Sequence, residues 1–311
     1  MAFTVSSLTN YVNEQSTELL TALQFAGETA SYANIQTGIK SSEALQILTN
    51  TPVPQDGSSC GFNASGDTAF TQRLITTKAV KYQDTLCPRT LETKWTQLLL
   101  KAGQNYDESS IPSKIVEDIR AQIQRINETA DWRGDTANVS SFLNPYDGLI
   151  KIIKAATGTT VATASTYNAT NARAILKNII SNISAAQKGD PGVKIFMGYD
   201  AAETYRQALM DANLFHVASG KDQKGLMAEG SVHEIIPVHG LDGLTGSTGD
   251  NPFIFALNPD RNLYLGVDME NEHEEAKMWY SQDDDNVKYS FRFRRGWQIA
   301  FPAEIVEYAN T

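Results

Sequence analysis

Residues 287–294 read Val-Lys-Tyr-Ser-Phe-Arg-Phe-Arg, and the pattern of this stretch has a period of two. Its odd-numbered positions are apolar or aromatic, and its even-numbered positions are polar or cationic. Such alternation predicts a strand with one buried face and one exposed face. The exposed face would carry Lys288, Arg292 and Arg294. This stretch is therefore the strongest indication of a sheet in the chain.

Further strands are predicted on both sides of this stretch. We expect Arg295-Gly296 to form a bend or bulge, after which the alternation resumes over 297–301. Upstream, strands are expected at 193–197, 232–238, 252–257 and 262–267. The last two would pair around the turn at 258–261.

The clearest helix is predicted at 113–131, with Ser113 as N-cap and Gly134 beyond its end. Its apolar stripe would consist of Ile115, Val116, Ile119, Ile123, Ile126 and Ala130. The face turned away would carry Glu117, Arg120, Gln124 and Glu128. Helices are also expected at 171–186 and 199–213. Helices mixed with hairpins and antiparallel strands indicate the α+β class.

The N-terminal third has a thinner hydrophobic pattern. Residues 1–40 look like an arm, and residues 41–95 like a long hairpin with strands near 41–48 and 70–86 and a polar tip at 57–66. A two-stranded hairpin has too little core to be stable alone. We therefore expect it to need a neighbour, and Thr71 to Leu86 to lie across an adjacent subunit.

Composition narrows the class of protein. The chain has 311 residues, is 41% hydrophobic and carries a formal net charge of −10. It has no apolar run of the roughly 18 residues that cross a bilayer, and its start does not resemble a secretory signal. An acidic protein is a poor candidate for tight binding to nucleic acid. Cys60 and Cys87 are expected to be free thiols of a cytoplasmic protein.

No motif of a catalytic, cofactor or metal site stands out. His233 and His239 would lie about 20 Å apart along a strand, too far to share a metal. The acidic stretches at 268–275 and 283–285 lack the spacing of a calcium loop. The glycine-rich stretch 240–249, which we expect to be a flexible loop, lacks the Lys-Ser/Thr ending of a phosphate-binding loop. We therefore expect no enzyme, no cofactor and no metal.

Several passages together resemble a known family. They are Gly-Ser-Val-His-Glu-Ile-Ile-Pro-Val at 230–238, Phe-Ile-Phe-Ala at 253–256, Asn-Leu-Tyr-Leu-Gly-Val-Asp at 262–268, Tyr-Ser-Phe-Arg-Phe-Arg-Arg-Gly-Trp at 289–297 and Pro-Ala-Glu-Ile-Val at 302–306. In this order they resemble the Hong Kong 97-type major capsid proteins of tailed phages, whose fold is shared with encapsulin shells.

The resemblance implies a division of the chain. It gives an N-terminal arm at 1–40, the E-loop region at 41–95, and a P-domain part at 96–144 with the spine helix at 113–131. An A-domain would follow at 145–258, and strands completing the P-domain at 259–311.

The function implied is a subunit that assembles with its own copies, as hexamers and pentamers, into an icosahedral or prolate shell around double-stranded DNA. Scaffold, portal and decoration proteins are possible partners, no membrane is expected, and the location would be the virion, assembled in the bacterial cytoplasm. Only about 40 residues precede the hairpin, so a separate scaffold protein or none is implied. An encapsulin-like compartment with a protein cargo, an uncharacterised enzyme and a tail or adhesion component remain alternatives.

The candidate contact residues between subunits lie in two places. On the hairpin they are Arg73, Leu74, Val80 and Tyr82. On the cationic strand face they are Lys288, Arg292 and Arg294, which we expect to pair with acidic segments of a neighbouring copy.

Overall fold

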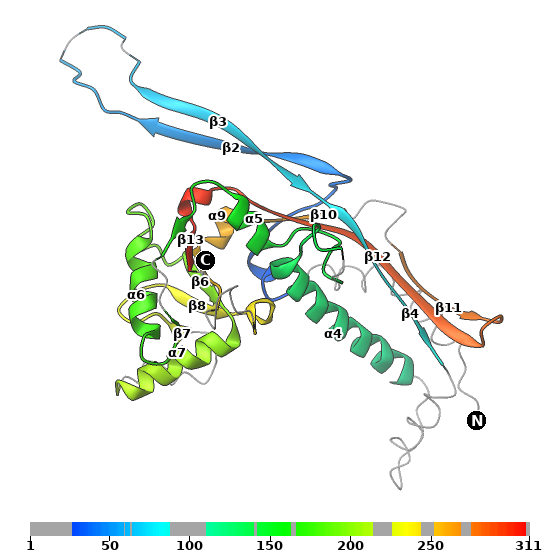
Figure 1. Ribbon diagram of the computed structural model, residues 1–311. Helices are drawn as coiled ribbons and strands as arrows, with labels where there is room; N and C mark the ends of the chain where they lie inside the picture. The colour runs from blue at the N-terminus through cyan, green and yellow to red at the C-terminus, as the bar shows by residue number, and fades with distance from the viewer. Residues whose placement is uncertain are drawn as a thin grey trace.

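The computed structural model describes residues 27–58, 60–62, 64–87, 110–139, 142–162, 166–213, 226–243, 252–268 and 275–308. These residues form two sheets, each covered by helices, and a long hairpin that projects from them (Figure 1). The mixture of helices and largely antiparallel strands confirms the α+β class.

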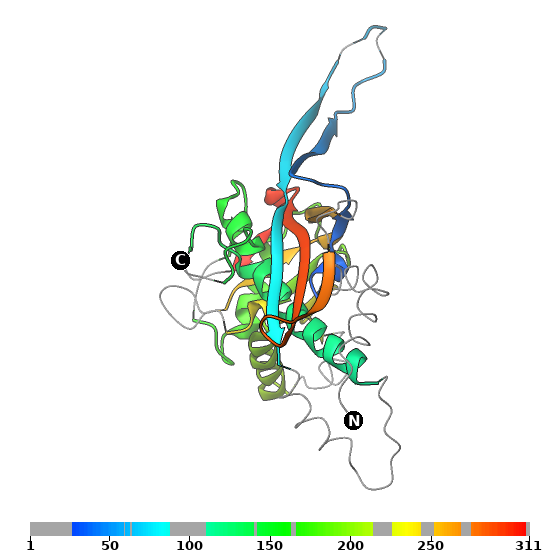
Figure 2. The ribbon, with the colours of Figure 1, turned by 90° about the vertical axis from the view of Figure 1, so that its right-hand side faces the viewer.

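The first sheet has five strands in the order β1 (Asn34–Gln36), β10 (Leu263–Val267), β12 (Asn286–Ile299) and β11 (Glu275–Ser281), with β4 (Lys78–Leu86) on the other edge of β12. Strand β12 connects the whole sheet because it pairs with β4 and β11 along its first part and with β10 at its end. Figure 2 shows β4, β12 and β11 side by side.

Helix α4 (Ser110–Arg133) covers one face of this sheet. Val116 and Ile123 of the helix pack against Met278, Val287 and Phe291. The predicted spine helix is thus present, and it begins three residues earlier than expected. Glu128, which we predicted to point away from the core, is only 3% exposed. The apolar stripe did not reveal this because the C-terminal end of α4 is covered on several sides.

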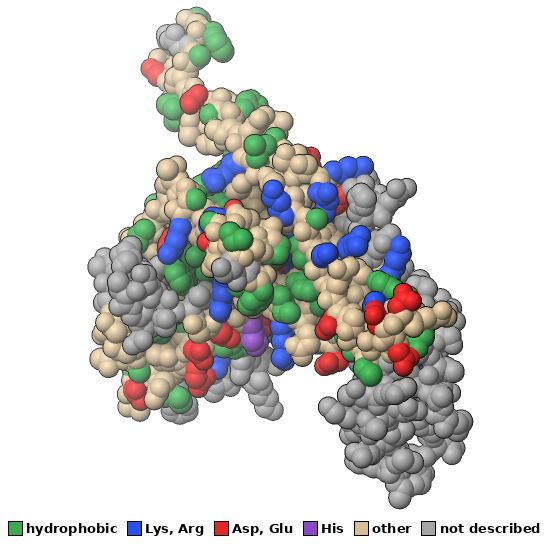
Figure 3. Space-filling view, turned by 45° about the vertical axis from the view of Figure 1, so that its right-hand side comes forward, with side chains coloured by type: hydrophobic (Ala, Val, Ile, Leu, Met, Phe, Trp, Pro, Cys, Tyr) green, Lys and Arg blue, Asp and Glu red, His purple; other side chains and the backbone are tan. Residues whose placement is uncertain are grey.

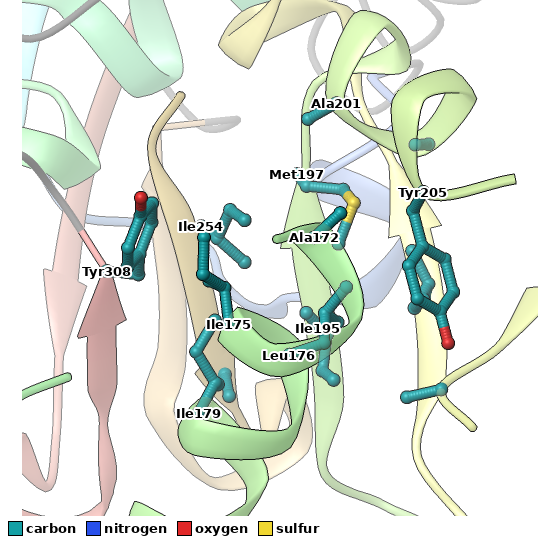
Figure 4. Packing of buried hydrophobic residues seen from close by; sticks show 14 of the residues in the cluster. Ala172, Ile175, Leu176, Ile179, Ile195, Met197, Ala201, Tyr205, Ile254 and Tyr308 are labelled. Atoms are coloured by element: carbon teal, nitrogen blue, oxygen red, sulfur yellow. The ribbon is translucent and has the colours of Figure 1, made fainter. Parts of the chain in front are cut away.

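The second sheet has six strands in the order β5 (Thr160–Val161), β13 (Val306–Tyr308), β9 (Ile254–Leu257), β6 (Lys194–Met197), β8 (Glu234–Pro237) and β7 (Leu226–Met227). Helices α6 (Ala172–Asn182) and α7 (Tyr199–Asp211) pack on one face, as Figure 4 shows for Ile175, Leu176 and Tyr205. Phe196 and Phe255 point to the other face, against Trp132 of α4 and the short helix α5 (Leu149–Ala155).

Short 3-10 turns lie between these helices and strands. The 3-10 turns η1 (Ala30–Tyr32) and η2 (His239–Leu241) both lie close to the end of α4, and η3 (Pro302–Glu304) leads into β13. Gly240 and Leu241 are buried, so the beginning of the predicted flexible loop is packed; residues 244–249 lie outside the described residues. Gly240 must be glycine because a Cβ there would clash with the Trp132 ring.

Two strand predictions are wrong. Strands β9 and β10 do not pair: the helical turn α9 (Pro259–Asn262) carries the chain from the second sheet to the first. Strand β12 runs through Arg295-Gly296 without a break. Glycine at position 296 allows the backbone of Thr76 to approach closely, because a Cβ there would clash with the carbonyl oxygen of Thr76.

The projecting hairpin consists of β2 (Ser42–Pro52) and β3 (Gly66–Thr76), paired over their whole length. It ends earlier than predicted, because the chain crosses at the buried Thr77 into β4, which pairs with β12. The hydroxyl of Thr77 donates a 2.8 Å hydrogen bond to the carbonyl oxygen of Ile39 and so fixes this crossing. Residues 1–26, which make up most of the predicted arm, lie outside the described residues, and so do residues 88–109.

Candidate assembly interface

One face of the β2–β3 hairpin is apolar and uncovered by the described chain. Leu48 lies opposite Phe70, and Leu74 lies four residue pairs further along, opposite Ala44, with Gln46 opposite Gln72 between them on the same face. Directly opposite residues share a face, so these side chains form one patch. The exposed fractions of Leu48, Phe70 and Leu74 are 56%, 74% and 61%. Large apolar side chains exposed together on one face mark a candidate interaction site.

The opposite face of the same hairpin is anchored at its base. Leu45 and Ile75 are 6% and 0% exposed and pack with Ile39 and Tyr264 of the body. Period-two alternation thus turns one set of apolar side chains inward and the other outward. The base is part of the fold of this chain, and the outer face is available to something else.

The far part of the hairpin is acidic. Between residues 44 and 72, Asp56 and Asp67 are the only charged side chains. Figure 3 shows acidic groups along the projecting hairpin, beside hydrophobic ones. Val53 and Phe62 are 54% and 94% exposed in the same region. This distal hairpin therefore presents apolar and negative groups together.

A cationic surface lies on the face of the first sheet turned away from α4. It consists of Lys81 of β4, Lys277 of β11 and Lys288, Arg292 and Arg294 of β12. Lys288 pairs with Asp284, and Arg294 donates to the carbonyl oxygen of Lys40. Figure 3 shows Lys and Arg side chains gathered beside the base of the hairpin.

Arg292 and Lys81 lie directly opposite each other in the register of β12 and β4, and both are exposed. Like charges at such positions destabilise a sheet. On its other side Arg292 lies opposite Glu275 of β11, whereas no ion pair of Lys81 is found among the described side chains. An external negative group would relieve this repulsion, so the cationic surface is suited to an acidic partner.

Two of the predicted contact residues lie inside the chain's own core. Val80 is 5% exposed, and the Tyr82 ring stacks on Phe293 at 5.9 Å between centroids. The Tyr82 hydroxyl donates a 2.8 Å hydrogen bond to Oδ1 of Asn127, and burial raises the pKa of Tyr82. The expectation that residues 78–86 cross a neighbour is corrected, because β4 already pairs with β12.

Of the remaining hairpin candidates, Leu74 is on the open apolar patch, whereas Arg73 is on the opposite face and half-buried. Burial lowers the pKa of the Arg73 guanidinium. The structure therefore brings the sequence-predicted residues to two separate places: the hairpin and the cationic surface.

The sequence did not reveal a buried ionic network at the end of α4. Asp131 and Arg295 are 0% and 1% exposed. Arg295 donates through Nε to Oδ1 of Asp131 at 2.8 Å and through Nη2 to Oδ2 at 2.5 Å. Tyr146 and Trp297 donate to the same Oδ1 at 2.7 and 2.6 Å. The Asp131 carboxylate raises the pKa of the buried Arg295 guanidinium, and the pair locks α4 to β12.

Glu128 forms a second buried group one turn earlier. It accepts hydrogen bonds from the backbone N–H of Thr29, at 3.2 Å, and from the Thr29 hydroxyl. Trp132 Nε1 donates to that hydroxyl oxygen at 2.7 Å. Burial raises the pKa of Glu128 to about 7, and the nearby Asp131 carboxylate contributes in the same direction. This carboxyl group is thus poised to titrate near neutral pH.

The described residues contain no group of three or more His, Cys, Asp or Glu side chains that could hold a metal ion. His233 is buried against the carbonyl oxygen of Val193, whereas His239 contacts Glu28. Cys60 and Cys87 are exposed and are not joined by a disulfide. Residues 269–274 lie outside the described residues, as do His216 and His273. None of the helices in the described ranges is long and apolar enough to cross a membrane.

Comparison with known proteins identifies the fold. No family model and no curated protein matches the chain. A structure of Gordonia phage Cozz matches with a TM-score of 0.62 at 12% identity, over 90% of this chain and 85% of that one. The procapsid of satellite phage P4, determined with its size determination protein, matches with a TM-score of 0.60 at 11% identity, over 95% and 100%.

A virus-like particle from Pyrococcus furiosus matches with a TM-score of 0.53 at 11% identity, over 96% of this chain and 99% of that one. The matches to the Gordonia phage and P4 structures thus extend over nine tenths or more of this chain. The chain has the Hong Kong 97-type capsid fold, as its sequence pattern predicted.

Proposed function

We propose that this chain is the major capsid protein of a tailed phage, a subunit that assembles with its own copies into a closed shell around double-stranded DNA. The observation that carries the proposal is the hairpin face of Leu48, Phe70 and Leu74, which stays exposed although the same hairpin buries Leu45 and Ile75 at its base. A fold matching phage shell structures over nearly its full length supports the same conclusion.

In this proposal the hairpin is the E-loop, α4 is the spine helix of the P-domain, and the six-stranded sheet belongs to the A-domain. The A-domain would occupy 145–258, but β13 at the C-terminus also adds a strand to its sheet. The subunits would form hexamers and pentamers, with the virion as location and the host cytoplasm as place of assembly. The role is structural, without catalysis.

The contact between subunits follows from charge and shape. The distal hairpin carries Asp56 and Asp67, whereas the cationic surface of a second copy offers Lys81 and Arg292, which lie opposite each other. We place the hairpin of one copy across that surface, so that Leu48, Phe70 and Leu74 are covered at the same time. Obligate interfaces of this kind bury on the order of 2,000–5,000 Å².

Serine substitution of the open patch tests the proposal. The triple variant Leu48→Ser, Phe70→Ser, Leu74→Ser removes apolar surface that its own chain does not cover, so we expect folded subunits that fail to form shells. Sedimentation velocity and negative-stain microscopy measure assembly, and circular dichroism measures folding. A matched control is Val161→Ser with Met210→Ser, since these side chains are 54% and 50% exposed on other elements.

The control variant should assemble like the wild type. Normal particles from the triple variant, or from a chain that lacks the tip at 57–66, would contradict the role of the hairpin. A wild-type chain that stays monomeric at high concentration would contradict the proposed function as a whole.

The second candidate is an encapsulin-like compartment for a protein cargo, because encapsulin shells share the Hong Kong 97-type fold. The content of the particles distinguishes a phage shell from an encapsulin-like compartment. Particles purified from the native source should protect DNA from nuclease if the shell belongs to a phage. Particles that contain a stoichiometric protein and no protected DNA would favour the compartment.

A further inference from the structure

Segment 27–33 packs between the C-terminal end of α4 and the six-stranded sheet of the proposed A-domain. Thr29 and Ala30 are 0% and 1% exposed, and the Tyr32 ring meets Phe196 edge-on at 5.9 Å. The segment has only a single 3-10 turn of its own, η1, so side-chain contacts hold it in place. The contact of Thr29 with Glu128 is the one that reaches into the spine helix.

The charges around Glu128 do not balance. On its own helix it faces Asp131, with Arg125 at the rim of the same pocket. Segment 27–33 adds Glu28, and η2 adds His239, which is held to Glu28 at 2.9 Å. Arg295 of β12 is the buried cation, but its Nε and Nη2 groups donate to Asp131.

Tyr199 at the start of α7 also points toward this group and donates to Glu28 at 3.1 Å. Glu128 is therefore a second buried acid beside an ion pair that is already neutral. An ionised buried carboxylate without its own cation is costly, so the group is more stable when it carries a proton.

We propose that Glu128 is a proton-controlled latch that keeps segment 27–33 docked on the spine helix when neutral and loosens it when ionised. The protonated group keeps hydrogen bonds with Thr29 and has no repulsion from Asp131 and Glu28. The ionised group is more stable in water, where it is reached by opening the segment. The device lies within one chain, so it is independent of whether the chain builds a phage shell.

The direction of the pH effect follows from linkage. The pKa of Glu128 is raised from its ordinary value of 4.5 to about 7 in the docked state. The stabilisation of the docked state by the proton is thus fully present below pH 4.5, and it is lost as the pH rises toward 7. With these two values, the opening equilibrium of the segment should increase about tenfold between pH 6 and 8.5.

Hydrogen exchange with mass spectrometry measures this on the full chain, in particles or free subunits. The reporters are the amides of Thr29, Tyr32 and Ala33, which donate to Glu128, Thr29 and Ala30. After correction for intrinsic exchange rates, their protection should fall about tenfold from pH 6 to 8.5 in the wild type. Flat protection across this range in the wild type would overturn the proposal.

Three variants test whether the pH-dependent loss of protection comes from Glu128. In Glu128→Gln the amide can still bond Thr29 but cannot titrate, so the protection should stay high and constant within about twofold. Glu117→Gln removes the same charge from an exposed position of α4 and should behave like the wild type. His239→Gln removes the imidazole that contacts Glu28, and the fall should remain. A fall that persists in Glu128→Gln or disappears in His239→Gln would refute Glu128 as the latch.

Discussion

The hairpin β2–β3 continues at Thr77 into β4, an edge strand of the sheet β4–β12–β11, yet the hairpin and the sheet differ in the burial of their apolar side chains. In the sheet, Phe291 and Phe293 are each 1% exposed because α4 and the body cover them. In the hairpin, Phe70 is 74% exposed because no described element lies over it. The boundary between the exposed hairpin and the covered sheet is Thr77, where the chain passes from β3 to β4.

This contrast separates residues that fold the subunit from residues that we propose to join subunits. Where a helix covers the sheet, a substitution should change the free energy of unfolding of a single chain. Where the strands project, a substitution should leave that free energy nearly unchanged and act on assembly. The predictions below test whether the two kinds of effect separate.

The largest effect on folding is expected at the buried ion pair. Asp131→Ala leaves the Arg295 guanidinium without its carboxylate and also removes the acceptor of Tyr146 and Trp297. Loss of one partner of a buried pair costs about 3–5 kcal/mol. Urea denaturation of unassembled subunits measures the loss, with Asp118→Ala, an exposed acid of the same helix, as control. A loss below about 1 kcal/mol would show that the closed region does not depend on this network.

A smaller effect separates two neighbouring residues of β3. Ile75 is 0% exposed and packs with Ile39 and Leu45, whereas Leu74 is 61% exposed on the opposite face. Ile75→Ala should lower the free energy of unfolding of dilute subunits by about 3 kcal/mol. Leu74→Ala should change it by less than about 0.5 kcal/mol.

For assembly we expect the larger effect from the substitution of Leu74. Leu74→Ala should slow shell formation, followed by light scattering, while its subunits remain as stable as the wild type. Equal destabilisation by the two substitutions would mean that the outer face of the hairpin is covered within the chain, and the comparison that opens this Discussion would fail.

The sequence predicted the fold class and the long helix because these depend on local periodicity. The alternation of Phe291 and Phe293 with Arg292 also placed the cationic surface correctly. Arg295 shares the parity of the aromatic face, so unbroken alternation would have placed its charge inside, whereas we expected a bend or bulge at Arg295-Gly296.

The partners of buried polar groups could not be predicted in this way. Asp131 and Arg295 are 164 residues apart, and Glu128 meets Thr29 from 99 residues away. The end of the hairpin was also missed, because 70–86 is uniformly extended and only the pairing of β4 with β12 divides it. Local pattern specifies a strand, whereas tertiary contact decides which sheet receives it.

The smallest effect is expected at the cationic surface, where the two regions would meet between copies. Arg292→Glu changes an exposed charge, so the free energy of unfolding should shift by less than about 0.5 kcal/mol. It should nevertheless slow assembly at low salt if the acidic hairpin of another copy approaches there, because complementary charge mainly affects the association rate. Lys188→Glu, a similar charge reversal at an exposed position that follows α6, is the control.

Adding Asp67→Arg on the hairpin reverses the charge of the proposed partner. The double variant Asp67→Arg, Arg292→Glu should therefore recover part of the assembly rate, and the recovery should weaken as salt screens the pair. If Arg292→Glu assembles like Lys188→Glu, or if the second reversal slows assembly further, the hairpin seats elsewhere on its neighbour. The apolar patch would then carry the contact without help from charge.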